Sequence, residues 1–165
     1  MPTRSTSSTP TPYDFRRPHK FNREHVRALQ IVGETFARRF AATLSTTVRA
    51  VSQITLDGVS QFTYDEYIRA LPNPACMAII TLEPLPGTAA LHLPVPVLYE
   101  AIDHLLGGPG GSVMGDQPLT EIEMGLARQF QERALVELAR SFESIVTLTP
   151  RLLHQEANQI GRAHV

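Results

Sequence analysis

The sequence predicts an α/β domain whose order of elements begins to repeat in its last third. Apolar stripes run through residues 22–44, in steps of three and four residues, and through 120–142, in steps of three to five, which is typical of amphipathic helices. Two apolar, β-like runs, 75–82 and 88–93, flank a connection rich in proline and glycine. The order helix, strand, short helix, hairpin, helix restarts near residue 120 with helix and strand. This indicates a weak internal repeat whose second half is incomplete.

The first helix is predicted to begin at Asn22, a favourable N-cap residue. Six residues at helical spacing form its apolar side: Val26, Leu29, Val32, Phe36, Phe40 and Leu44. The pattern then changes, because Ile54 and Leu56 lie two positions apart in a β-branched stretch. We therefore expect a strand that starts near residue 51 and ends at Asp57-Gly58.

A short helix and a hairpin are expected next. Thr63 and Glu66 have the spacing of a capping box, which predicts a helix that runs to Leu71. The runs 75–82 and 88–93 form a hairpin with the five-residue connection 83–87. Because residues 75–82 are apolar on both faces, we expect this strand at the centre of the sheet, covered on each side.

A further helix, from Pro94 onwards, ends in a glycine-rich stretch. Its sequence is Leu105-Leu106-Gly107-Gly108-Pro109-Gly110-Gly111. Two of these glycines would be enough to end a helix, and Pro109 prevents any return to helix. The residues alone leave two alternatives open. The stretch is either a linker between two helices or a loop whose backbone another molecule approaches closely.

The last predicted elements follow a loop at 112–118. Thr120 and Glu123 form a second capping-box pair, which opens a helix that ends near Phe142. Its apolar stripe consists of Ile122, Leu126, Phe130, Leu135, Leu138 and Phe142. The β-branched run 145–149 is predicted to start another strand.

The composition is that of a globular domain and excludes several classes of protein. Hydrophobic residues make up 42% of the 165 residues, charged residues 19%, and the net charge is −1. Cys76 is the only cysteine, so an internal disulfide and a cysteine-held zinc are excluded, and a reducing cytoplasmic setting fits best. The longest apolar run is far shorter than the roughly 20 residues of a membrane span, so we expect no direct membrane insertion.

No catalytic arrangement is supported by the sequence. Asp103 and His104 are adjacent, and neighbouring residues point about 100° apart on a helix, which does not suit an acid–base pair. The glycine-rich stretch follows a helix instead of a strand, and Lys20 is the only lysine, so a phosphate-binding P-loop is excluded. The histidines have no metal-binding spacing. We expect no enzymatic activity and no cofactor.

The N-terminal part of the chain has a different character. Residues 1–12 are mostly Ser, Thr and Pro, and are interpreted as a disordered tail or linker. Residues 13–21 mix basic and aromatic side chains, as segments that bind single-stranded nucleic acid do. An arm pinned to the domain by its aromatic side chains explains this mixture better, so we expect no nucleic acid as a partner.

Three stretches together carry a resemblance to a known family. They are Tyr13-Asp14-Phe15-Arg16-Arg17-Pro18, the segment 63–74 with the sequence TYDEYIRALPNP, and Leu105-Leu106-Gly107-Gly108-Pro109-Gly110. Their order and spacing resemble the middle domain of the flagellar motor switch protein FliM. The helix start at 119–123 and Pro150-Arg151-Leu152 strengthen the match. The resemblance covers residues 13–158.

The resemblance implies a CheC-like, pseudo-symmetric α/β/α domain with an incomplete second half. It implies a structural and signalling part of the flagellar motor switch, the C-ring, at the cytoplasmic face of the inner membrane in the basal body. The implied partners are FliG, neighbouring FliM copies, phosphorylated CheY and, in a full-length chain only, FliN. The implied FliG-binding loop is Leu106, Gly107, Gly108, Pro109 and Gly110.

One alternative within the same class is a CheC-type module that binds CheY. Related phosphatases use a Glu-x-x-Asn pair on a helix, and no Glu of this sequence is followed by Asn three positions later. The alternative is therefore a binding module without phosphatase activity. Residues 159–165 depart abruptly from the family pattern and are predicted to be a non-native tail, which the coding nucleotide sequence would test.

Overall fold

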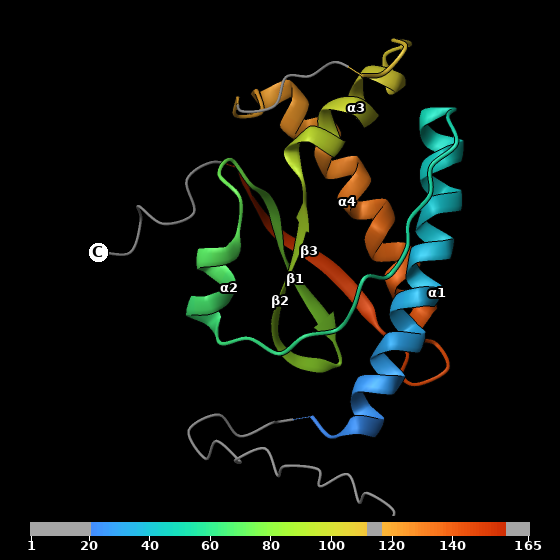
Figure 1. The fold of residues 1–165 in the computed structure, drawn as a ribbon, viewed down its shortest axis with the longest axis vertical. Helices are drawn as coiled ribbons and strands as arrows, with labels where there is room; N and C mark the ends of the chain where they lie inside the picture. The colour runs from blue at the N-terminus through green and yellow to red at the C-terminus, as the bar shows by residue number, and fades with distance from the viewer. Residues whose placement is uncertain (1–20, 112–116, 158–165) are drawn as a thin grey trace, which may run out of the picture.

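The computed structural model describes residues 21–111 and 117–157, which fold into helices packed on a small sheet (Figure 1). Within these residues the elements are α1 Arg23–Val48, α2 Tyr64–Ala70, β1 Cys76–Glu83, β2 Leu85–Leu93, α3 Val95–Leu105, α4 Glu121–Phe142 and β3 Thr149–Ala157. The predicted tail 1–12, the basic segment up to residue 20, most of the loop 112–118 and the predicted tail 159–165 lie outside the described residues.

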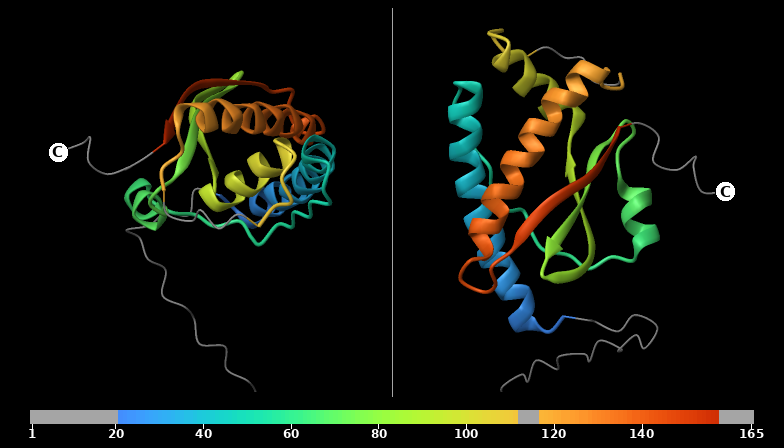
Figure 2. Two further views of the ribbon diagram at one scale, coloured as in Figure 1. Left: turned by 90° about the horizontal axis from the view of Figure 1, so that it is seen from above. Right: turned by 180° about the vertical axis from the view of Figure 1, so that it is seen from behind.

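The sheet is antiparallel and has the strand order β2-β1-β3 in the described part of the chain. Helices α1, α3 and α4 gather on one side of it, and α2 lies on the other side (Figures 1 and 2). The central position predicted for residues 75–82 is confirmed, because β1 pairs with both neighbours. Its first three residues are buried, so both faces are covered at that end, whereas burial decreases toward Glu83.

The core lies between the sheet and the three helices. One cluster joins Cys76 of β1 to the buried side of α3 and to Phe130 of α4. A second cluster joins Ala78 and Ile80 of β1 to Leu135 of α4. Burial of apolar area is worth roughly 25 cal/mol per Å², and these contacts hold α3 and α4 against β1.

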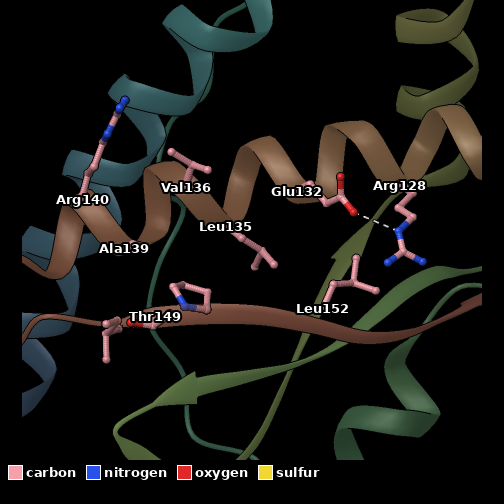
Figure 3. A pocket seen from close by; sticks show the side chains of 10 residues that line it. Arg128, Glu132, Leu135, Val136, Ala139, Arg140, Thr149 and Leu152 are labelled. Carbon is pink, nitrogen blue, oxygen red and sulfur yellow. Dashed lines mark hydrogen bonds and ion pairs between the residues drawn. The ribbon is translucent and has the colours of Figure 1, made fainter.

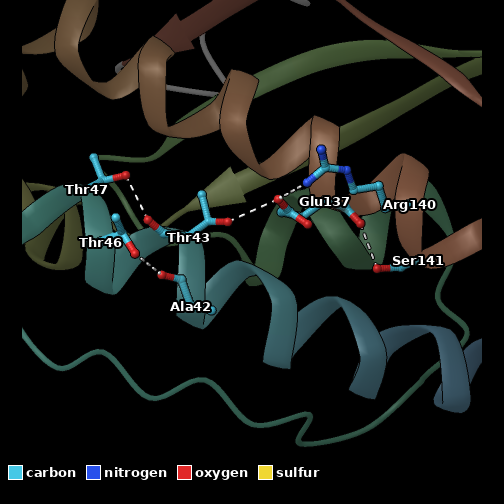
Figure 4. A network of polar contacts seen from close by, with 7 residues as sticks. All are labelled: Ala42, Thr43, Thr46, Thr47, Glu137, Arg140 and Ser141. Atoms are coloured by element: carbon cyan, nitrogen blue, oxygen red, sulfur yellow. Dashed lines mark hydrogen bonds and ion pairs between the residues drawn. The ribbon is translucent and has the colours of Figure 1, made fainter.

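A polar contact locks α1 to α4 within this apolar surrounding (Figure 4). Glu137 of α4 is 6% exposed, and its Oε1 accepts a hydrogen bond from Thr43 Oγ1 of α1 at 3.1 Å. The same oxygen accepts a bond from the Arg140 guanidinium at 3.0 Å. A buried carboxylate is tolerated only when it is paired in this way, so the contact fixes how the two helices align.

The predicted helix starts are confirmed in atomic detail. The Asn22 side chain accepts the His25 N–H at 2.8 Å. Thr63 and Thr120 each exchange hydrogen bonds with the glutamate three residues later, which completes both capping boxes. These caps depend only on local sequence, which is why the spacing alone predicted them.

The prediction of a strand at residues 51–57 is wrong. The segment is extended but belongs to no sheet in the described chain. Its burial alternates as in a strand, with Ser52, Ile54 and Leu56 half-buried and their neighbours exposed. The partner is helix α1, because the Leu56 side chain lies against Gly33. The alternating pattern therefore predicted correctly which of these residues are half-buried. It could not show whether a helix or a neighbouring strand covers them.

Three smaller corrections concern boundaries and one exposed residue. The last strand begins at Thr149, because Ile145 and Val146 still donate their N–H groups to the Phe142 carbonyl in a turn after α4. The hairpin connection is shorter than five residues, since β1 ends at Glu83 and β2 begins at Leu85. Ile122 is 79% exposed and does not continue the buried stripe of α4.

Candidate functional site

The glycine-rich loop starts from a firmly anchored helix. Val95, Leu98 and Ile102 of α3 are each at most 4% exposed, and all three belong to the larger core cluster. The Tyr99 hydroxyl lies 3.3 Å from the carbonyl oxygens of Gln117 and Pro118, to which it donates. This contact ties α3 to the chain that leads into α4. The base of the loop is therefore fixed from both directions.

The first part of the loop is a Schellman motif. Gly107 has a φ of 90°, and its N–H donates to the His104 carbonyl oxygen at 3.0 Å. The Gly108 N–H donates to the Asp103 carbonyl oxygen at 2.8 Å. These two bonds satisfy carbonyl groups that a helix end would otherwise leave unpaired. The end of the helix is therefore enough to explain why residue 107 is a glycine.

The next two glycines have a different reason to be glycine. The Gly110 N–H donates to the Asp103 carboxylate, with 2.8 Å between nitrogen and Oδ2. A Cβ atom on Gly108 would lie 2.3 Å from that carboxylate, and one on Gly110 would lie 2.5 Å from Nε2 of His104. The side chains of Asp103 and His104 therefore occupy the space that side chains at 108 and 110 would need.

Asp103 and His104 do not act together as an acid–base pair in this arrangement. The carboxylate of Asp103 is directed at the backbone of the loop, and the imidazole of His104 lies under Gly110. Sequence reasoning considered these residues only for catalysis and missed their role in shaping the loop. The five-residue spacing from Asp103 to Gly108 is that of a Schellman motif, so it could have indicated the backbone bond between them but not the side-chain contacts.

The loop turns its apolar residues outward. Leu106 is 74% exposed, although it is a large hydrophobic residue, and Pro109 is exposed as well. The structure therefore brings the five predicted residues together in one turn, with the polar backbone bonded inward and Leu106 facing solvent. An exposed leucine on an ordered loop is suited to insertion into a pocket on a partner.

Two hollows of the described chain lie outside the loop. A groove between α4 and β3 holds an exposed ion pair between Arg128 and Glu132 at 2.9 Å (Figure 3). An apolar groove of about 530 Å³ lies between α1, α3 and β2, and His104 lines it from the loop side. Neither hollow gathers a constellation of titratable groups that indicates chemistry.

The only thiol and the potential metal ligands of the described residues do not indicate a chemical site either. Cys76 is fully buried, and burial raises the pKa of its thiol, as expected for an unreactive cysteine in an apolar strand. Among residues 21–111 and 117–157, no three His, Cys, Asp or Glu side chains are close enough together to hold a metal ion. None of the helices in that part of the chain is long and apolar enough to cross a membrane.

Comparison with solved structures shows which known fold the chain adopts. The chain superimposes on the crystal structure of the FliM middle domain from H. pylori with a TM-score of 0.77 and 23% identity, covering 88% of this chain and 78% of that one. The FliG–FliM complex from H. pylori gives a TM-score of 0.81 at 23% identity, covering 88% and 80%. FliY of Thermotoga maritima has a similar fold. The CheC-like α/β fold predicted from the sequence is thereby confirmed.

The family follows from the sequence matches. The model of the family described as flagellar motor switch protein FliM matches residues 22–161. FliM of Treponema pallidum is 38% identical over 148 residues, which make up 90% of this chain and 43% of that protein. The chain belongs to the FliM family, as the resemblance predicted. It spans less than half the length of this relative.

Proposed function

We propose that this chain is the middle domain of a flagellar motor switch protein and that it docks FliG through the loop Leu106, Gly107, Gly108, Pro109 and Gly110. In this role it is a structural and signalling part of the C-ring, helps to set the direction of rotation in chemotaxis and motility, and has no enzymatic activity. The ring lies at the cytoplasmic face of the inner membrane, in the flagellar basal body. The domain comprises residues 13–158.

The observation that carries the proposal is the exposed Leu106 on a loop whose backbone is bonded internally. A flexible surface loop loses conformational entropy when it binds a partner, and a loop that is already held by internal hydrogen bonds loses less. Membership of the FliM family and the existence of a FliG–FliM complex in H. pylori make FliG the expected partner. Neighbouring FliM copies and phosphorylated CheY are further partners in this proposal, with FliN in a full-length chain.

Binding of FliG to loop variants tests the proposal. We expect Leu106→Ala and Gly110→Ala each to weaken binding at least tenfold, or about 1.4 kcal/mol, by isothermal titration calorimetry. Val136→Ala is the matched control, because Val136 is an apolar residue that is 50% exposed on α4, away from the loop. Unchanged binding in both loop variants would refute the loop assignment. Binding of CheY in place of FliG would support the CheC-type alternative.

A further inference from the structure

We infer that Asp103 is a positioning residue, which holds the docking loop, residues 106–110, in its binding-competent shape before a partner arrives. The inference rests on the proposed binding of FliG and adds to it a cause for the shape of the loop. Asp103 is half-buried on α3, and it is the residue through which the helix holds both ends of the turn 108–110.

Two different groups of Asp103 make these contacts. Its backbone carbonyl accepts the Gly108 N–H, and its carboxylate Oδ2 accepts the Gly110 N–H, both at 2.8 Å. The proline between these glycines has no N–H to donate. Every amide donor from Gly108 to Gly110 is therefore bound by one residue of α3.

The identity of Gly108 supports the same conclusion. Its φ lies outside the left-handed region, so its backbone conformation does not require glycine. A Cβ atom there would meet Oδ2 and Oδ1 of Asp103 at 2.3 and 2.4 Å. Gly108 is thus needed for the close approach of the Asp103 carboxylate. Gly107 provides the contrast, since a Cβ atom at this position would meet open space.

The consequence for binding concerns the fraction of chains whose loop has the binding-competent shape. A carboxylate is a stronger acceptor than a neutral group, so the bond to Gly110 favours one loop conformation over the open ones. The apparent dissociation constant of a partner rises as the fraction of chains with the competent loop falls. Loss of the Asp103 side chain should therefore weaken binding without removing any contact surface of the loop.

The first experiment compares Asp103→Ala with Asp103→Asn in the 165-residue chain. Asparagine keeps the size and an acceptor oxygen, whereas alanine removes both. We expect Asp103→Ala to bind FliG at least tenfold more weakly and Asp103→Asn to stay within about threefold of the parent chain. Hydrogen exchange of the Gly110 amide, followed by NMR, should be fast in Asp103→Ala and slow in Asp103→Asn.

The second experiment is a double-mutant cycle. Gly108→Ala should displace the carboxylate and weaken binding about as much as Asp103→Ala, and the double variant should be no worse than either single variant. Gly107→Ala is the matched control, and its effect should add to that of Asp103→Ala. If Asp103→Ala does not fold, Gly108→Ala alone decides, because it displaces the carboxylate from the opposite side.

The outcomes separate this inference from the proposed function. Asp103→Ala with parent-like binding overturns the inference, and so does slow Gly110 exchange in Gly108→Ala. Asp103→Asn also overturns it if this variant binds as weakly as Asp103→Ala while its Gly110 amide still exchanges slowly, since the loop would then be held and the lost charge would contact the partner directly. If the parent chain binds no FliG, the proposed function fails, while Gly110 exchange still decides whether Asp103 shapes the loop. Leu106→Ala should weaken binding and leave Gly110 exchange unchanged.

Discussion

Helices α1 and α3 end at the same end of the molecule, and they end in different ways (Figure 1). After α1 the chain turns at Arg49, a non-glycine residue with a φ of 53°. After α3 it passes through four glycines, three of which have positive φ. Both stops are effective, so one left-handed residue is enough to end a helix in this protein.

The difference lies in what holds the chain after the stop. After α1, the Ser52 N–H donates to Ser45 Oγ at 2.8 Å, and Leu56 then lies on Gly33, so the chain returns along the helix. After α3, the loop is held by Asp103 and His104 and keeps Leu106 in solvent. The comparison teaches that only the first glycine after α3 serves the helix end, and that those at 108 and 110 serve the shape of an exposed loop.

The largest stability effect is expected from Gly110→Ala. Its φ of 81° is unfavourable for alanine, and its Cβ would collide with the imidazole of His104. We expect the free energy of unfolding to fall by about 1–3 kcal/mol in urea denaturation followed by circular dichroism. Gly107→Ala, with a positive φ but open space for its Cβ, is the control and should lose only the backbone cost of about 1 kcal/mol. Equal losses would show that His104 gives way and that packing under the loop is not specific.

Leu56→Ala tests the other side of the comparison. The Leu56 side chain is half-buried against α1, and its segment has no strand partner in the described residues. We expect a loss of about 1–2 kcal/mol, which is below that of a fully buried leucine, because part of the side chain is already exposed. Proteolysis should become faster within 50–62, and FliG binding should not change. A change in binding would show that the two helix ends are coupled.

The sequence could predict what depends on neighbours in the chain. The caps at Asn22, Thr63 and Thr120, the central position of β1 and the glycine stop of α3 all follow from the local sequence, and the structure confirms them. The partner of 51–57 could not be predicted in this way, because alternation reports burial and not the identity of the covering element. The family resemblance could suggest the docking loop, but the positions of the Asp103 and His104 side chains required coordinates.

Arg49→Gly should act in the opposite direction from the loop variants. Arg49 is exposed and adopts the left-handed conformation, which costs an L-residue roughly 1–2 kcal/mol. Glycine removes this cost but increases the entropy of the unfolded chain, so we expect a net gain of about 0.5–1 kcal/mol. Urea denaturation measures it, with Arg38→Gly inside α1 as the control that should lose stability. A loss in Arg49→Gly would mean that the arginine side chain contributes more than its backbone costs.

Gly33→Ala gives the smallest expected effect and the sharpest contrast with Gly108→Ala. In a helix interior alanine is favoured over glycine by about 1 kcal/mol, and Gly33 lies within α1. Its Cβ would lie 3.0 Å from Leu56 Cδ1, so the leucine must move by a few tenths of an ångström. Leu56 belongs to a segment without ladder hydrogen bonds, and it can move, whereas the Asp103 carboxylate opposite Gly108 is held by the Gly110 amide.

We therefore expect Gly33→Ala to leave the free energy of unfolding within about 0.5 kcal/mol of the parent chain. A loss above about 1 kcal/mol would mean that the segment after α1 is held as rigidly as the loop after α3, and the distinction between the two helix ends would then be one of exposure alone.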